Sequence, residues 1–300
     1  MAENQTRYIQ TITTYYPQIN LTNLRFNQTD GKHCDIVTVN DEVLFKFSRY
    51  DWTAAFLTNQ IRVTDFIRGY VNMPLPRMEP LGTGAAKCEF VKGEPLYRED
   101  ILLMSESDQN HIARQIGVFL RQLHTIPPKL LKENRILEIP YDLSRETVLS
   151  ELEQIKRKVY PYCDSYEQKR IARVFRPVVE NEDFLIHSPC LIHADLSPRC
   201  FLHDVKTKKM KGVIGFGCAG IGDPAYDFGV AIQTFGETFV KRIGKYYGSL
   251  TGLMDRARFY AGYNELLLKK NIADRIITRD FSGFRLDSFA ADRMPVGSPV

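Results

Sequence analysis

The chain carries LIHADLSPRCFLHD at residues 191–204 and GVIGFGCAGIGDPAYDFG at residues 212–229, and these two segments are its most informative part. In the first segment Asp195 follows a short apolar run, and Cys200 comes five residues later. In the second segment Gly215 follows another apolar run and stands directly before a Phe-Gly pair. Short apolar runs bounded by glycine, proline and aspartate are typical of buried strands that end in loops. We therefore expect Leu202 and Val213-Ile214 to lie on two short strands that flank the loop carrying Asp195.

The spacing of these residues corresponds to the loops that carry out phosphoryl transfer. This reaction needs an Asp that orients the acceptor hydroxyl and accepts its proton, and metal ions that bridge the phosphates. In protein kinases the Asp stands five residues before an Asn that holds Mg²⁺, and a second Asp opens a metal-binding Asp-Phe-Gly. Here Asp195 supplies the first Asp, whereas Cys200 and Gly215 occupy the two metal-ligand positions.

Residue by residue, these segments resemble the aminoglycoside phosphotransferases and their choline, homoserine and macrolide kinase-like relatives. The pattern LIH-x-D-x-S-x-x-x-x-L is most similar to that of the aminoglycoside 2''-phosphotransferases, and the resemblance covers roughly residues 8 to 265. It implies a two-lobed, protein-kinase-like α+β fold. A small antiparallel β lobe with one key helix is expected at residues 1–92, a mainly helical lobe at 93–280, and a loosely ordered tail at 281–300.

The resemblance also implies the roles of individual residues. Lys46 matches the strand lysine that contacts the nucleotide phosphates, and Gln60 stands where the family has that lysine's Glu partner. Glu89 and Val91 fall in a stretch similar to the hinge between the lobes, so they are expected to bind the nucleotide. Asp195 is the implied catalytic base, and the implied cofactors are ATP or GTP with Mg²⁺.

Five positions around the expected nucleotide site depart from the family by losing a carboxylate or an amide. They are Gln60, Cys200, Gly215, Cys218 and the loop at residues 31–34. Mg²⁺ prefers oxygen ligands and is held poorly by thiols, so we expect no metal at Cys200 and Gly215. The predicted function is a small-molecule kinase with impaired transfer. The alternative is a pseudokinase that binds a nucleotide or small molecule without efficient transfer.

Other acids and thiols near the site leave further alternatives open. Asp204 could replace the missing metal ligand, whereas Asp223 and Asp227 match family positions that support the loop and a neighbouring helix. Cys200 could act as a nucleophile in metal-independent chemistry, although a small buried side chain is the simpler interpretation. Cys34, Cys200 and Cys218, with His33 and His203, could together bind zinc. The absence of C-x-x-C pairs among the six cysteines favours free thiols in a reducing compartment.

The predicted substrate is a small molecule with a hydroxyl group, similar to an aminoglycoside, which would make the protein an antibiotic-resistance enzyme. Aminoglycosides are polycations, and the family places carboxylates after the DP-x-x-D motif. The corresponding stretch here contains only Glu237, and Glu265 comes later. These two residues and Asp195 are the predicted substrate contacts. Because acids are sparse, a neutral hydroxyl substrate also remains open.

Composition excludes several other classes of function. The formal net charge is only +4 and no long Lys/Arg block occurs, so we expect no nucleic-acid partner. The N-terminus lacks the layout of a signal peptide, and no apolar run is long enough to span a membrane. A hydrophobic share of 44% is ordinary for a globular protein, and we expect a cytoplasmic location.

Periodicity predicts the main elements around these motifs. Residues 34–40, 43–47 and 85–91 have the pattern of strands, and Asn40-Asp41-Glu42 predicts a hairpin turn. Helices are predicted from Asp51 or Thr53 to about 69, from Ser105 or Ser107 to Pro127, and over 144–160, 164–180 and about 226–270.

Overall fold

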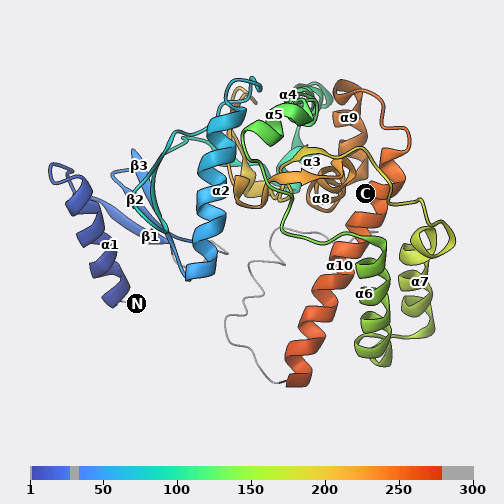
Figure 1. Ribbon diagram of the computed structural model, residues 1–300. Helices are drawn as coiled ribbons and strands as arrows, with labels where there is room; N and C mark the ends of the chain where they lie inside the picture. Colours follow the sequence, from blue (N-terminus) through green and yellow to red (C-terminus); the bar gives the residue numbers. More distant parts are fainter. Residues whose placement is uncertain (1, 28–33, 279–300) are drawn as a thin grey trace.

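The computed structural model describes residues 2–27 and 34–278 (Figure 1). Its N-terminal part contains a five-stranded antiparallel sheet with the strand order β1-β2-β3-β5-β4. The strands are β1 (Leu24–Asn27), β2 (Cys34–Val39), β3 (Val43–Ser48), β4 (Met78–Pro80) and β5 (Ala85–Glu89). Helix α1 (Ala2–Tyr15) precedes the sheet, and α2 (Asp51–Ile67) connects β3 with β4. The two helices lie on opposite sides of the sheet in Figure 1.

The pleat of β3 points its alternate side chains to two different sides of the sheet, one facing α1 and the other facing α2. Successive side chains of a strand point to opposite sides. Phe45 and Phe47 therefore share one side, where Tyr8 of α1 stacks on Phe47 with ring centroids 4.3 Å apart. Lys46 points to the other side, where its Nζ donates a hydrogen bond of 3.1 Å to Gln60 of α2. The alternation thus places Lys46 between the sheet and α2.

The predicted hairpin and strands of this part are confirmed. β2 and β3 pair over their whole length, from Cys34 opposite Ser48 to Val39 opposite Val43. Asn40 and Asp41 form the turn with φ angles of 55° and 54°. Two consecutive residues with positive φ suit a tight hairpin turn, and Asn and Asp tolerate this conformation better than most residues.

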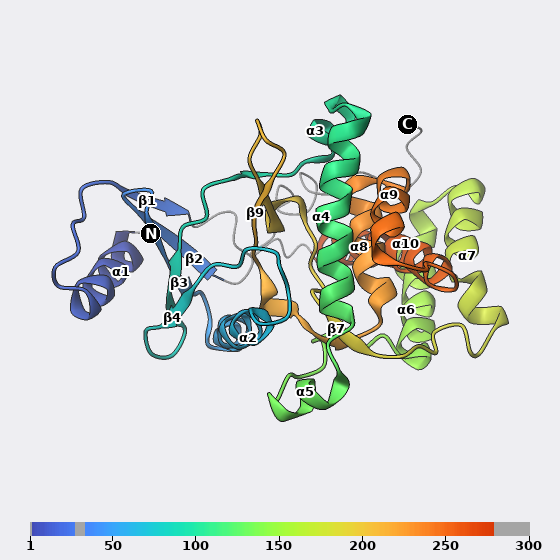
Figure 2. The ribbon, with the colours of Figure 1, turned by 90° about the horizontal axis from the view of Figure 1, so that it is seen from above.

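The rest of the chain is mainly helical. Its helices are α3 (Arg98–Leu103), α4 (Glu106–His124), α5 (Pro128–Glu133), α6 (Arg145–Lys158), α7 (Ser165–Glu180), α8 (Pro224–Phe235), α9 (Glu237–Tyr247) and α10 (Leu253–Thr278). Helix α8 lies against both α9 and α10, and α4 lies against α9. Figure 2 shows α4 crossing this group, with α6 and α7 at the far end from the N-terminal sheet.

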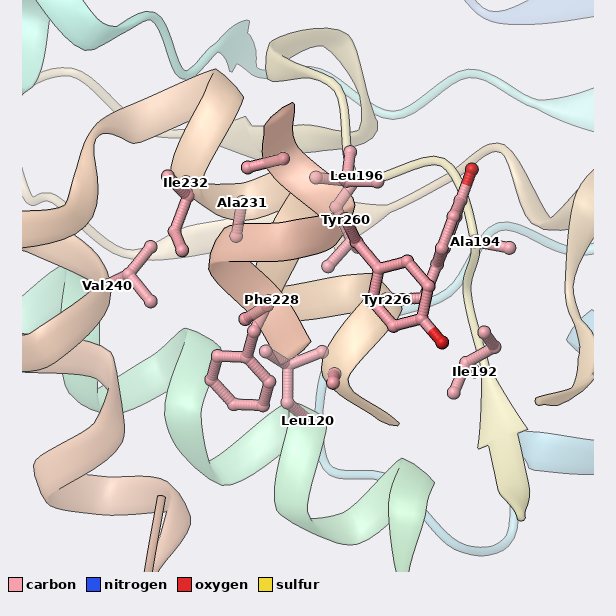
Figure 3. Packing of buried hydrophobic residues seen from close by; sticks show 14 of the residues in the cluster. Leu120, Ile192, Ala194, Leu196, Tyr226, Phe228, Ala231, Ile232, Val240 and Tyr260 are labelled. Atoms are coloured by element: carbon pink, nitrogen blue, oxygen red, sulfur yellow. The ribbon is translucent and has the colours of Figure 1, made fainter. Parts of the chain in front are cut away.

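A large hydrophobic cluster joins these helices to the loop at residues 193–200. Tyr226 of α8 and Tyr260 of α10 pack edge to face with ring centroids 5.4 Å apart. Ala194 and Leu196 bury their side chains in the same cluster, close to these rings (Figure 3). Val63 of α2 also belongs to it. The loop that carries Asp195 is therefore anchored on the helical core, to which α2 is also attached.

Two small sheets flank the loops at residues 193–200 and 214–219. Strands β6 (Glu94–Pro95), β8 (Phe201–His203) and β9 (Met210–Val213) form one, and β7 (Cys190–Ile192) pairs with β10 (Gly220–Gly222) in the other. The first loop therefore runs from β7 to β8, and the second from β9 to β10. The short strands predicted at Leu202 and Val213 are confirmed as β8 and β9, which pair with each other, whereas Ile214 follows the end of β9.

Several boundaries differ from the sequence predictions. The helix predicted from Asp51 or Thr53 is α2, but its N-cap is Tyr50, whose backbone N–H donates to the Thr53 hydroxyl. Ser105 caps α4 as predicted, by accepting a hydrogen bond of 3.1 Å from the backbone N–H of Asp108. Helix α1 and strand β1 were not predicted. The expected tail at residues 281–300 lies outside the described residues, and the lobe boundary at 92 and 93 stays a prediction.

No helix in the described part of the chain is long and apolar enough to cross a membrane.

Candidate active site

The loop after β7 is held by one buried carboxylate. Both oxygens of Asp227 accept backbone hydrogen bonds, from His193 N at 2.8 Å and from Ala194 N at 2.7 Å. His124 contributes a third contact to Asp227, at 3.1 Å through Nε2. Ala194 has a φ of 63°, which is uncommon for a residue with a side chain. Asp227 thus fixes a strained backbone turn directly before Asp195, which confirms its predicted structural role.

The imidazole of His193 connects the two loops. Its Nε2 lies 3.0 Å from the carbonyl oxygen of Ile214, and the backbone N–H of Asp195 donates to its Nδ1 at 3.3 Å. These partners require a neutral ring with the proton on Nε2, because a carbonyl only accepts and an N–H only donates. The ring also packs on Phe216, with centroids 4.5 Å apart. His193 therefore links the backbone of Asp195 to the loop that contains Gly215.

The Cys200 thiol lies in the space that a side chain at position 215 would occupy. Gly215 has a φ of +94°, and a Cβ atom added there would lie 2.9 Å from Cys200 Sγ and 3.7 Å from His193 Cε1. The Cys200 thiol is 5% exposed and donates a hydrogen bond of 2.9 Å to the carbonyl oxygen of Asp195. The thiol thus fills space that a side chain at position 215 would need. The two departures from the family pattern are complementary in shape.

Two residues that the sequence analysis missed hold the second loop. Asn59 of α2 donates from Nδ2 to the carbonyl oxygens of Gly217 at 3.1 Å and Ala219 at 2.8 Å. The Tyr141 hydroxyl donates to Cys218 Sγ at 3.2 Å. The acceptors of Asn59 are 158 and 160 residues away, so rules for local side-chain bonds do not identify it. No local signal identifies Tyr141, which is 77 residues distant from its partner.

The predicted nucleotide contacts lie on the sheet and just beyond it. Lys46 has Gln60 as its partner, as the resemblance to the family implied, and the Gln60 side chain is buried. Glu89 ends β5, and its carboxylate accepts a hydrogen bond of 3.1 Å from the backbone N–H of Arg77. Val91 lies next to β9, since a Cβ added at Gly212 would be 3.1 Å from its Cγ1. Nucleotide binding by these residues stays a prediction.

Two acids near the site in sequence, Asp204 and Asp223, are engaged in other contacts. Asp204 lies in the turn between β8 and β9, where it accepts backbone hydrogen bonds from Lys206 and Thr207 and pairs with Lys211 at 3.5 Å. The bond from the Thr207 backbone N–H is the main reason that the pKa of Asp204 is held at about 2. Asp223 accepts from Arg256, Tyr260 and its own helix N-terminus.

At the two metal-ligand positions of the family, Cys200 offers a thiol and Gly215 no side chain, whereas a hard cation needs oxygens. Among the described residues, no three His, Cys, Asp or Glu side chains come together as a group that could hold a metal ion. The proposed zinc site also included His33, which lies outside those residues. All six cysteines are free thiols. The burial of Cys200 and its hydrogen bond to a carbonyl suit a structural thiol better than a nucleophile.

The two glutamates among the predicted substrate contacts form ion pairs in the helical part. Glu237 receives two hydrogen bonds from Arg258, at 2.8 and 3.1 Å, and Lys241 lies 2.9 Å away. The Arg258 guanidinium holds the pKa of Glu237 at about 2. Glu265 pairs with Arg170 at 2.8 Å and with Lys269 at 3.2 Å. Each of these carboxylates is neutralised by two cations, so neither gives the site an unpaired negative charge. Their substrate role stays a prediction.

Comparison with known proteins agrees with the sequence resemblance. A model of the phosphotransferase enzyme family matches residues 30–260. Wild-type aminoglycoside 2'-phosphotransferase-IIIa in its GDP complex superposes with a TM-score of 0.81 at 20% identity, covering 93% of this chain and 94% of that chain. The GDP and kanamycin complex of APH(2")-IIIa gives 0.79 at 21% identity, with 92% and 94% covered.

A more distant match extends the same fold. Macrolide 2'-phosphotransferase MphH from Brachybacterium faecium has a TM-score of 0.68 at 13% identity, covering 97% of this chain and 99% of that chain. At such identities the likeness establishes the fold alone. The two-lobed, kinase-like α+β architecture expected from the sequence is therefore confirmed.

Proposed function

This chain belongs to the phosphotransferase enzyme family, and on that premise we propose that it binds ATP or GTP and transfers the terminal phosphoryl group slowly to a hydroxyl of a small molecule. The observation that carries the proposal is the intact support of the catalytic loop. Asp227 still holds the amides of His193 and Ala194, and so presents Asp195 after a strained turn. Strained backbone at such a position is retained when the surrounding structure enforces it.

In this proposal each residue has one task. Lys46 binds phosphate oxygens, and Gln60 orients its ammonium group through a neutral hydrogen bond rather than an ion pair. The Asp195 carboxylate orients the acceptor hydroxyl and accepts its proton as the phosphoryl group is transferred. Glu89, at the end of β5, and Val91, just beyond it, contact the base of the nucleotide. No step is assigned to Mg²⁺, because the residues at its expected site do not suit it.

The acceptor that we propose is an aminoglycoside-like molecule with several hydroxyl groups. Solved structures of similar fold include a complex with GDP and kanamycin and a complex with gentamicin. The neutralised state of Glu237 and Glu265 favours an acceptor with fewer positive charges than those drugs.

The test is product detection by mass spectrometry after long incubation of the protein with ATP or GTP and kanamycin, with gentamicin in parallel. We expect a slow gain of one phosphoryl group by the acceptor, and its loss in Asp195→Asn. Nucleotide affinity, measured by calorimetry, should be nearly the same in both proteins. Product formation that survives Asp195→Asn would contradict the assigned role of Asp195.

A second candidate function is nucleotide binding without transfer, and one observation favours it. A Cβ atom added at Gly215 would lie 2.9 Å from Cys200 Sγ, so the thiol occupies space that a metal-ligand side chain at position 215 would need. Loss of metal clamping removes a major electrostatic contribution to phosphoryl transfer. Tight nucleotide binding with no product from any acceptor would establish this second function and exclude the first.

A further inference from the structure

A separate pocket of about 540 Å³ opens beside α4. Its walls come from α4, from residues 72–74 between α2 and β4, and from the start of β9. Figure 2 shows α4 and β9 as neighbours. None of its lining residues in the described part of the chain belongs to the loops 193–200 or 214–219. The volume lies within the range of roughly 300–1,000 Å³ that is typical of small-molecule sites.

The walls of this pocket are fixed by hydrogen bonds. Gln115 of α4 donates to the Lys208 carbonyl at 2.9 Å and accepts from the Met210 backbone N–H at 2.8 Å. Gln122 accepts a hydrogen bond of 3.0 Å from the backbone N–H of Asn72. Both side-chain amides are therefore already used in joining α4 to its neighbours. The pocket is preformed and needs no ordering before a ligand enters.

The floor of the pocket is apolar and rigid. It is formed by Met73, Val118, Phe119 and Met210. Phe119 is 1% exposed and packs edge to face against Phe201, with centroids 6.4 Å apart. A floor of this kind favours an alkyl or aromatic group, because burial of apolar surface stabilises a complex by about 25 cal/mol per Å².

The rim carries positive charge that nothing in the described structure neutralises. Arg114 and Lys209 lie at the rim with the imidazole of His111, and no Asp or Glu lines the pocket. Within residues 2–27 and 34–278, none of these three side chains forms a hydrogen bond or an ion pair. The nearby cations differ in this respect, since Lys211 pairs with Asp204 and Arg242 pairs with Glu106.

We propose that this pocket binds a small amphiphilic anion, with an alkyl body on the floor and a carboxylate head between Arg114 and Lys209. Charge complementarity selects the head group, because a cationic head would face two like charges. The apolar floor selects the body, so a small inorganic anion would leave most of the pocket unfilled. The site shares no lining residue with the two loops of the proposed transfer reaction, although Phe119 packs against Phe216 of the second loop.

The test uses three probes of equal chain length on the full chain: octanoate, octan-1-ol and octan-1-amine. Calorimetry and saturation-transfer NMR should show saturable binding of octanoate with a Kd of about 1 mM or below, as expected for roughly ten non-hydrogen atoms. Octan-1-amine should bind at least about tenfold more weakly. Equal binding of the two charged probes would overturn the proposal.

Variants then place the binding site. Arg114→Gln with Lys209→Gln should weaken octanoate binding at least about tenfold. The matched control is Lys129→Gln with Arg176→Gln, which makes the same change in net charge at exposed positions of α5 and α7 and should change nothing. Val118→Trp should fill the pocket and remove binding of all three probes. Octanoate binding that survives these changes, or that ADP displaces, would contradict the assignment to this pocket.

Discussion

The close contact between Gly215 and Cys200 predicts that a side chain added at position 215 destabilises the protein. Gly215→Ala adds one Cβ atom that meets Cys200 Sγ at 2.9 Å, at a φ of +94°. The positive φ costs about 1–2 kcal/mol for a residue with a side chain. Displacement of the thiol from its buried place adds about 1–3 kcal/mol, as expected for overpacking. The free energy of unfolding should therefore fall by about 2–5 kcal/mol.

A glycine elsewhere in the chain separates these two costs. Gly252 also has a positive φ, of +72°, but an added Cβ there has no heavy atom within 4 Å. Gly252→Ala should therefore show the backbone cost alone, about 1–2 kcal/mol. The excess cost at Gly215 measures the overlap with Cys200. Urea unfolding followed by circular dichroism gives both values for two-state transitions.

A double-mutant cycle with Cys200→Ala completes the test. Removal of Sγ should relieve the overlap, so the double variant should be about 1–3 kcal/mol more stable than the sum of the single effects. Additive effects within about 0.5 kcal/mol would refute the reasoning. Equal costs at Gly215 and Gly252 would refute it as well. The same overlap opposes Gly215→Asp, so a metal ligand should be restored only when Cys200 is also replaced.

Three further predictions concern the nucleotide contact, the catalytic loop and acid stability. Lys46→Met should weaken ATP binding about 10- to 100-fold in calorimetry, because it removes a charged hydrogen-bond donor. Asp227→Asn should lower the free energy of unfolding by about 1–3 kcal/mol, because an amide cannot accept with both ends from His193 and Ala194. Because the folded-state pKa of Glu237, about 2, lies below its ordinary 4.5, its stabilisation is present above pH 4.5 and is lost as the pH falls towards 2. Glu237→Gln should therefore lower the Tm at pH 7 and flatten its fall between pH 5 and 2, and an unchanged pH profile would contradict the role of this ion pair.

Much of the site was predictable because its information is local in the sequence. Asp195, Cys200 and Gly215 lie within 21 residues of each other, and strand pairing around them brings the loops together. Lys46 was singled out by its resemblance to the family's strand lysine, and the pleat of β3 accounts for its direction towards α2. Asp227 was predicted to support the loop, and its hydrogen bonds confirm that role.

The remaining features depend on contacts between distant residues. Tyr141 reaches Cys218, and Arg170 reaches Glu265, across 77 and 95 positions of the chain. Periodicity and spacing carry no signal for such pairs, because only the packed helices bring them together. Burial of the Cys200 thiol beside Gly215 is likewise a consequence of packing. For this reason the sequence did not show that Cys200 and Gly215, the two positions without a metal ligand, lie in contact with each other.

We expect the nucleotide site to persist without a magnesium site, and the first measurement is a titration of ATP and GTP with and without Mg²⁺. Nucleotide binding should be saturable, with a Kd that changes by less than about threefold when Mg²⁺ is added, a difference of roughly 0.6 kcal/mol. Binding that strengthens tenfold or more with Mg²⁺ would show that oxygen ligands other than the missing side chains at positions 200 and 215 hold the metal, and would contradict this expectation.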